Sequence, residues 1–182
     1  MMKTKRLVLA ALCVALGVVL PMALHPIVNA GSVLLPMHIP VLLCGLICGW
    51  QYGLACGILA PLLSSVISGM PPVAYLPSMI CELSVYGLMC GLMMRHVRTG
   101  RLLGDIYISL ITSMLIGRII YGATNALIFN AGEYSMNIWI SAAFITSLPG
   151  IAIQLVLIPL IVMALEKTGM IGRRYRRSAV CK

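Results

Sequence analysis

Long apolar stretches dominate this sequence, and they constrain its fold more than any other feature. Six of them lie at about 7–24, 36–50, 52–68, 77–94, 105–129 and 138–165. Hydrophobic residues make up 61% of the 182 residues and charged residues only 9%, so polar side chains are too few to cover a water-exposed surface. A membrane-spanning helix needs about 20 apolar residues. We therefore expect an all-α membrane protein, with residues 1–182 forming a single integral membrane domain.

The number of crossings follows from the basic residues. The second and third stretches could also form one long helix over 39–68, which would leave five crossings. Twelve of the 13 Lys and Arg residues lie in three clusters, at 3–6, 95–101 and 167–182. Short loops rich in Lys and Arg stay in the cytoplasm, and only six crossings place all three clusters there. We predict a six-transmembrane-helix bundle with both termini cytoplasmic, a tight turn near 49–53 and a basic cytoplasmic tail at 166–182.

The loops expected on the outer side contain no Lys or Arg. They lie at 25–35, 69–76 and 131–137 and are rich in turn-forming residues. The start of the chain has an alternative interpretation, because a basic segment, an apolar run and Val28-Asn29-Ala30 are also typical of a cleavable secretory signal. That run is longer than the usual ~7–15 residues of such a signal, so we expect it to be retained. The intact mass of the protein would decide this point.

Several functional classes are disfavoured by composition. The net charge of +9 comes from clusters beside apolar runs, which predicts contact with anionic lipid headgroups rather than nucleic acid. Six of the seven cysteines lie within apolar runs and no CxxC pair occurs, so core thiols are expected instead of a metal site or disulfides. Motifs for a phosphate-binding loop, a zinc protease or a serine hydrolase do not occur. We expect no enzyme activity, cofactor or metal.

Small residues at a spacing of four predict close helix packing. They occur at Gly45, Gly49, Gly53 and Gly57 and again at Gly87 and Gly91. Ala11 and Ala15 form a similar pair in the first helix. Packing alone favours an internal contact for this alanine pair, and an external partner helix is the alternative.

Two charged residues lie well inside predicted helices, Glu82 in the fourth and Arg118 in the fifth. Charge within a membrane is costly and normally marks function or a pairing. Counted from the outer helix ends, Glu82 lies about 8 Å deep and Arg118 about 17 Å deep, which argues against a direct pair, although a long arginine could bridge part of the gap. Whether they pair with each other or face a ligand stays open.

Polar residues recur on one face of three consecutive helices. Helical spacing places Tyr121, Gly122 and Asn125 on the face of Arg118, Ser78 and Tyr86 on the face of Glu82, and Ser147 on the face of Gln154. Such faces must converge away from lipid, either in a cavity that opens outward or in interhelical hydrogen bonds. With His38 at the outer start of the second helix, the candidate substrate-binding residues are Arg118, Asn125, Tyr121, Glu82, Ser78, Tyr86, His38, Ser147 and Gln154.

A longer pattern joins several of these features. It consists of Ala11-x-x-x-Ala15, then His38-Ile39-Pro40 leading into the glycine series, then Tyr52-Gly53-x-x-x-Gly57. In this pattern, in its length and in its expected topology, the chain resembles the substrate-binding S components of energy-coupling factor (ECF) vitamin transporters.

That resemblance implies a plasma-membrane subunit that captures a water-soluble vitamin near the outer surface. It implies that Ala11 and Ala15 dock on a coupling transmembrane subunit, which joins two ATPase subunits. Pantothenate, cobalamin, riboflavin, folate and pyridoxine-type compounds are candidate substrates, and Arg118 favours one with an anionic group.

Two other functions remain as alternatives. A stand-alone secondary transporter could use helix breaks near the midplane, for which Pro21 and Pro149-Gly150 are the candidates. A small intramembrane enzyme could use Glu82, His38 or a cysteine, but the sequence shows no paired catalytic groups.

Overall fold

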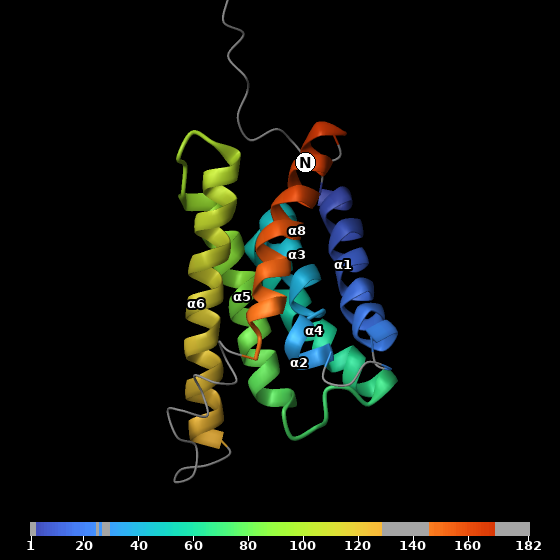
Figure 1. The fold of residues 1–182 in the computed structure, drawn as a ribbon. Coiled ribbons are helices and arrows are strands. Elements are labelled where there is room, and N and C mark those ends of the chain that lie inside the picture. The colour runs from blue at the N-terminus through green and yellow to red at the C-terminus, as the bar shows by residue number, and fades with distance from the viewer. Residues whose placement is uncertain (1–2, 25, 27–29, 129–145, 170–182) are drawn as a thin grey trace, which may run out of the picture.

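The computed structural model describes residues 3–24, 26, 30–128 and 146–169, and every regular element in these ranges is a helix. The helices pack side by side and run alternately up and down (Figure 1). In chain order they are α1 (Lys3–Leu24), α2 (Ala30–Leu34), α3 (His38–Cys48), α4 (Trp50–Ser68), α5 (Leu76–His96), α6 (Leu102–Ile128) and α8 (Leu148–Lys167).

Most of the expected crossings correspond to long helices. Five helices are long and apolar enough to cross a membrane, namely α1, α4, α5, α6 and α8. The second expected crossing is the shorter apolar helix α3, which has 11 residues. At ~1.5 Å per residue it is about 17 Å long, and the short helix α2 and a turn precede it.

A single glycine separates α3 from α4. Gly49 has φ 101° and ψ 171°, a conformation that residues with a Cβ rarely adopt. Its N–H still donates to the carbonyl of Gly45 at 3.1 Å, and its own carbonyl accepts from the N–H of Gly53 at 2.9 Å. The chain therefore reverses with almost no loop, and α3 and α4 pack against each other. The alternative of one long helix over 39–68 is wrong.

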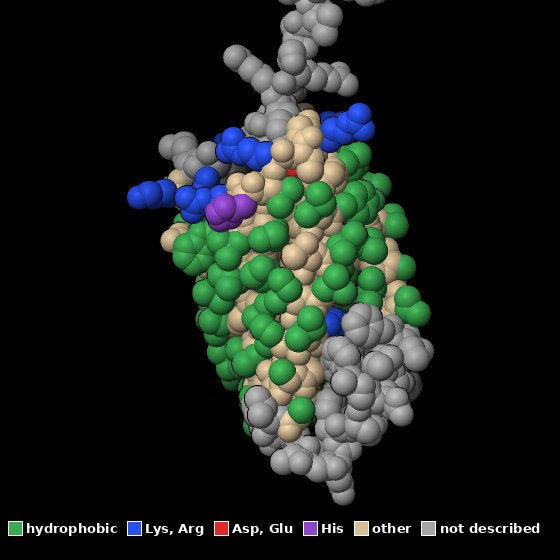
Figure 2. Space-filling model, turned by 90° about the vertical axis from the view of Figure 1, so that its left-hand side faces the viewer, with side chains coloured by type: hydrophobic (Ala, Val, Ile, Leu, Met, Phe, Trp, Pro, Cys, Tyr) green, Lys and Arg blue, Asp and Glu red, His purple; other side chains and the backbone are tan. Residues whose placement is uncertain are grey.

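The basic residues lie together at one end of the bundle. Lys3, Lys5 and Arg6 begin α1, Arg95 lies in the last turn of α5, and Lys167 is in the last turn of α8. Figure 2 shows Lys and Arg side chains gathered at the upper end, above a face covered by apolar side chains. We call this the basic end. The rest of the tail cluster, at 173–182, lies outside the described residues.

An aspartate organises the turn between α5 and α6 at this end. The backbone N–H and the hydroxyl of Thr99 each donate to Oδ1 of Asp105 at 2.8 Å. Asp105 is fully buried in the first turn of α6, where a negative charge also interacts favourably with the helix dipole.

Glycines let the backbones of α3, α4 and α5 touch. A Cβ added to Gly45 would lie 2.6 Å from the carbonyl oxygen of Gly87, and one added to Gly87 would overlap the backbone of Gly53. Gly57 and Gly91 are equally close to backbone atoms of a neighbouring helix. The prediction of close glycine packing is confirmed at these positions, whereas Gly49 has no atom within 4 Å of an added Cβ and forms the turn instead. The cysteines Cys13, Cys44, Cys48, Cys56 and Cys90 are free and belong to the core around these helices.

The sixth predicted helix begins later than expected. It was predicted to run over 138–165, but Thr146 and Ser147 form a turn and α8 starts at Leu148, with Pro149 in its first turn. Proline suits that position because the first helical N–H groups have no intrahelical partner. Residues 138–145 lie outside the described residues, as does the expected outer loop at 131–137.

Helix α2 was not predicted and lies within the expected outer segment 25–35. It packs against the start of α8, where a Cβ added to Gly150 would lie 2.6 Å from the carbonyl oxygen of Val33. After α2 the chain turns at Leu35, which has φ 50°, and enters α3 at His38. This turn positions the first residue of the candidate site.

Candidate functional site

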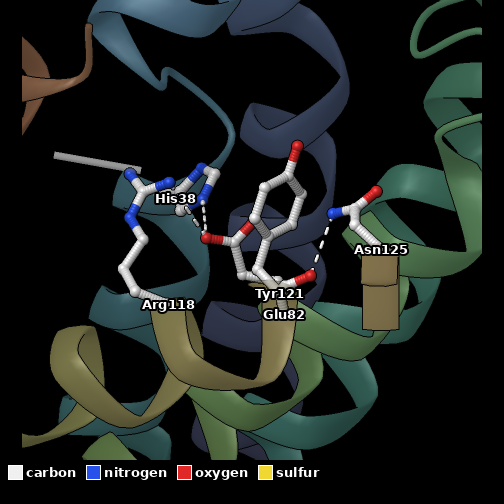
Figure 3. A network of polar contacts seen from close by, with 5 residues as sticks. All are labelled: His38, Glu82, Arg118, Tyr121 and Asn125. Carbon is white, nitrogen blue, oxygen red and sulfur yellow. Dashed lines mark hydrogen bonds and ion pairs between the residues drawn. The ribbon is translucent and has the colours of Figure 1, made fainter. Parts of the chain in front are cut away.

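The carboxylate of Glu82 on α5 is a charged group buried away from the basic end, and the residue is 3% exposed. Nη1 of Arg118, from α6, lies 3.3 Å from Oε1 of Glu82. Nε2 of His38, from the start of α3, lies 3.6 Å from the same oxygen. Figure 3 shows both side chains converging on this oxygen. Three helices thus contribute to one buried polar cluster, which we call the Glu82 cluster.

Tyr86 holds His38 beside the carboxylate. It lies one turn after Glu82 on α5, and its ring meets the His38 imidazole edge to face, with centroids 5.1 Å apart and planes at 64°. A Cβ added to Gly117 on α6 would lie 2.8 Å from Cε1 of Tyr86. Only a glycine leaves room for the tyrosine ring there. Sequence reasoning missed Gly117, and its position next to Arg118 was the available signal.

The depths estimated from the sequence argued against a direct pair of Glu82 and Arg118, but the two side chains are in contact. That argument measured both helices from their outer ends, but α6 has 27 residues and α5 has 21, so those ends are not level. Measured instead from the shared turn at 97–101, the two residues lie about 21 Å and about 24 Å along their helices. They are at similar heights, and the long arginine side chain closes the remaining gap.

Tyr121 and Asn125 continue the polar face of α6. The side-chain amide of Asn125 donates from Nδ2 to the carbonyl of Tyr121 at 2.9 Å, and Asn125 is buried while Tyr121 is half-buried. Figure 3 shows Arg118, Tyr121 and Asn125 pointing to the same side of α6. The predicted helical face is confirmed.

The two serines have more local roles than expected. The hydroxyl of Ser78 donates to the carbonyl of Tyr75 at 3.0 Å, which secures the first turn of α5. Ser147 is buried at the residue before α8, and its carbonyl accepts from the N–H of Ile151 at 2.9 Å. Ser147 is the residue directly before α8, and its shared face with Gln154 stays a prediction.

Several buried polar atoms of the site have no hydrogen bond within the described part of the chain. They are both ring nitrogens of His38, Oε1 of Glu82 and both amide atoms of Gln154, which is 1% exposed. The contacts from His38 and Arg118 to Glu82 are ion-pair contacts that do not satisfy hydrogen-bond geometry. Buried polar groups are nearly always hydrogen-bonded, and leaving one unpaired costs about 1–3 kcal/mol. The arrangement is therefore suited to bind a polar ligand or water.

The groups of the Glu82 cluster are suited to binding a small molecule. Among the described residues, no group of three or more His, Cys, Asp or Glu side chains is placed to hold a metal ion. The groups that converge are one carboxylate, one guanidinium, one imidazole and the ring of Tyr86. Such groups bind and orient a small molecule by hydrogen bonds and stacking.

Comparison with known protein families now adds to the geometry. A family model described as "ECF transporter, substrate-specific component" matches residues 5–162. The chain belongs to this family. No curated protein and no solved structure matches the chain. The family identifies a multi-pass membrane subunit of a transporter rather than an enzyme, with a small-molecule substrate and partner ECF subunits.

The structure also shows in which direction the small residues of α1 point in this substrate-specific component. Ala11 and Ala15 are both exposed, on a face that includes Leu12, which is 54% exposed. The other side of α1 packs on α4, where a Cβ added to Gly17 would lie 2.8 Å from Cβ of Ala60. The expectation of an internal contact for the alanine pair is wrong.

The helix breaks considered for a secondary transporter are not found at the positions proposed for them. Helix α1 continues through Pro21 to Leu24, and Pro149 lies in the first turn of α8 instead of interrupting it. Neither proline therefore creates a discontinuous helix in the described residues.

Proposed function

We propose that this substrate-specific component captures a water-soluble vitamin at the end of the bundle opposite the basic end. An ATP-driven importer then releases the vitamin into the cytoplasm. The coupling transmembrane subunit and two ATPase subunits of the importer are separate chains. The protein resides in the plasma membrane with its basic end, and thus both termini, in the cytoplasm, because short Lys- and Arg-rich segments remain on that side.

The observation that carries this proposal is the Glu82 cluster. A charged side chain in the middle of a membrane costs about 2.5–3.5 kcal/mol on insertion scales, and pairing offsets only part of that cost. His38, in the same cluster, and Gln154, on α8, carry buried donors and acceptors that have no hydrogen bond within the described residues. In a subunit that belongs to a substrate-specific family, a ligand that supplies those hydrogen bonds accounts for their presence.

The Glu82 cluster lies nearer to the end of the bundle opposite the basic end, which supports capture of the substrate from the outer side. Glu82 lies about two turns from the start of α5, and His38 is the first residue of α3. Both helices begin at the end opposite the basic end (Figure 1). A ligand from outside would therefore reach the cluster by a short path.

The exposed alanines of α1 support docking on a partner in the membrane. Helices associate in lipid through close backbone approach at small residues. Ala11 and Ala15 present such a surface, and no described helix covers it. We propose the coupling subunit as the partner that docks on this surface.

Reconstitution tests the function. The purified chain alone in liposomes is expected to bind the vitamin without accumulating it, whereas accumulation requires the coupling subunit, both ATPases and ATP. Concentrative uptake by the chain alone, driven by an ion gradient, would instead show a secondary transporter.

The orientation has its own test. A cysteine introduced at Arg98, in the exposed turn between α5 and α6, should react with a membrane-impermeant thiol reagent only from the cytoplasmic side. Labelling from the outside of intact cells would contradict the proposed topology.

A further inference from the structure

The two ring nitrogens of His38 have different surroundings. Nε2 lies 3.6 Å from Oε1 of Glu82, which is too far for a hydrogen bond. Nδ1 has neither a hydrogen bond nor an ion pair in the described part of the chain. Both nitrogens are buried, and the residue is 2% exposed. Because buried polar atoms are nearly always hydrogen-bonded, Nδ1 is suited to a partner that the described residues do not supply.

Glu82 indicates which nitrogen of His38 carries the hydrogen. Its Oε1 forms an ion pair with Arg118 at 3.3 Å, and an ionised carboxylate only accepts hydrogen bonds. A lone pair on Nε2 would face the lone pairs of this oxygen, whereas a hydrogen there is attracted to it. An isolated imidazole is mostly neutral at neutral pH, and a neutral ring has one donor and one acceptor nitrogen. The carboxylate thus favours the tautomer with the hydrogen on Nε2 and a lone pair on Nδ1.

Tyr86 holds the imidazole from a second side. The two rings meet edge to face with centroids 5.1 Å apart, and Tyr86 is 1% exposed. Gly117 leaves the space that the tyrosine ring occupies. With its ring packed on Tyr86 and Nε2 directed at Glu82, His38 presents Nδ1 in one direction.

From these observations we propose that His38 determines specificity by accepting, at Nδ1, a hydrogen bond from an N–H or O–H group of the substrate. This inference rests on the proposed substrate-binding function. Glu82 is a positioning residue for this bond, because it fixes the tautomer of the imidazole. An analogue that carries a methyl group in place of that hydrogen leaves the buried Nδ1 unpaired, and a site built around such a hydrogen bond rejects it.

The position of the hydrogen can be observed directly. The full chain is labelled with ¹⁵N-histidine and purified in mild detergent, and NMR spectra at neutral pH distinguish a ring nitrogen that carries a hydrogen from one that does not. The chain has three histidines, and the signals that disappear in His38→Asn are those of His38. We expect a hydrogen on Nε2 and none on Nδ1. A hydrogen on Nδ1 would overturn the inference.

Two substitutions separate the two nitrogens of His38. The side-chain amide of asparagine reaches about the position of Nδ1, and that of glutamine reaches about the position of Nε2. Pantothenate, cobalamin, riboflavin, folate and pyridoxine are each added to the unmodified chain, and a compound that raises the melting temperature is titrated into the variants by calorimetry. We expect His38→Asn to bind it at least about tenfold more tightly than His38→Gln does.

The control is His96→Gln, which makes the same change at an exposed histidine near the basic end and should bind as the unmodified chain does. Equal affinities of His38→Asn and His38→Gln, or the reverse order, would overturn the inference and leave the binding function standing. If none of the five compounds raises the melting temperature of the unmodified chain, the proposed vitamin-binding function fails and the inference with it.

Methylated analogues test the same bond from the side of the substrate. Each N–H and O–H group of the bound compound is methylated in turn, and the analogues are titrated into the unmodified chain and into His38→Gln. One analogue should bind the unmodified chain at least about tenfold more weakly than its parent, and the same methyl group should cost less than about threefold in His38→Gln, which lacks Nδ1. Equal losses in both proteins for every analogue would overturn the inference.

Discussion

Two sets of small residues in this protein follow the same sequence pattern and have opposite surroundings. The glycine set, Gly45, Gly53, Gly57, Gly87 and Gly91, lies where α3, α4 and α5 touch, and backbone atoms fill the space that a Cβ would need. The alanine pair, Ala11 and Ala15, follows the same spacing on α1 and is exposed. Spacing therefore identifies a surface suited to close helix packing, but it does not say whether the partner is in the same chain.

The glycine set also explains how the Glu82 cluster forms. The contact between Gly45 and Gly87 brings α3 within touching distance of α5. His38 and Glu82 lie on these same two helices and reach 3.6 Å. A wider separation of the backbones would move the imidazole away from the carboxylate. The internal set thus builds the site, whereas the alanine pair stays available for a partner.

The largest effect is expected in the glycine set. Gly87→Leu places a side chain against the backbone of Gly53, and the helices must separate at a cost of about 3 kcal/mol or more. We expect little monodisperse protein in size-exclusion chromatography, and rapid reaction of the buried cysteines with a thiol-specific dye. Normal recovery with protected cysteines would show that the backbones are not in close contact.

A large effect of a different kind is expected at the alanine pair. Ala11→Trp/Ala15→Trp should leave substrate binding and the melting temperature unchanged, because both positions are exposed. Uptake by the complete transporter should fall by about tenfold or more, because the bulky rings prevent close approach of a partner helix. The control is Ala123→Trp on α6, which is also exposed and lies at the opposite edge of the bundle (Figure 1). Equal uptake by the double variant and the control would remove the docking role.

An intermediate effect on stability is expected within the Glu82 cluster. Glu82→Gln breaks the buried ion pair with Arg118, and removing one partner of such a pair costs about 3–5 kcal/mol. Adding Arg118→Gln should recover much of that loss, so the two substitutions are not additive. The measurement is the melting temperature of each single variant and of the double variant, with unfolding followed by the reactivity of the buried cysteines. Additive losses would mean that the two side chains do not interact.

The smallest effect is expected at a glycine without close neighbours. Gly31 lies in α2, and a Cβ there would meet no atom within 4 Å. Gly31→Ala should stabilise the helix by about 0.5–1 kcal/mol, seen as a small rise in melting temperature. If Gly31→Ala lowered the stability as much as Gly87→Leu does, glycine contacts would not explain the difference between these positions.

Much of this architecture was predictable, and the failures have identifiable causes. The positions of the long helices, the break near Gly49 and the gathering of basic residues at one end follow from hydropathy, glycine and charge. The contact between Glu82 and Arg118 did not follow, because it depends on the unequal lengths of α5 and α6. The start of α8 was misplaced because hydropathy does not register the turn at Thr146 and Ser147.

By itself, the sequence determined that the chain belongs in a membrane, and it determined which helix faces carry polar groups. Hydropathy and charge act residue by residue, so a linear pattern is enough to establish them. The tertiary structure alone decided that Arg118 and His38 meet the same oxygen of Glu82, and that Ala11 and Ala15 face outward. Those outcomes depend on the rotation and axial stagger of neighbouring helices, which close glycine contacts between distant segments set.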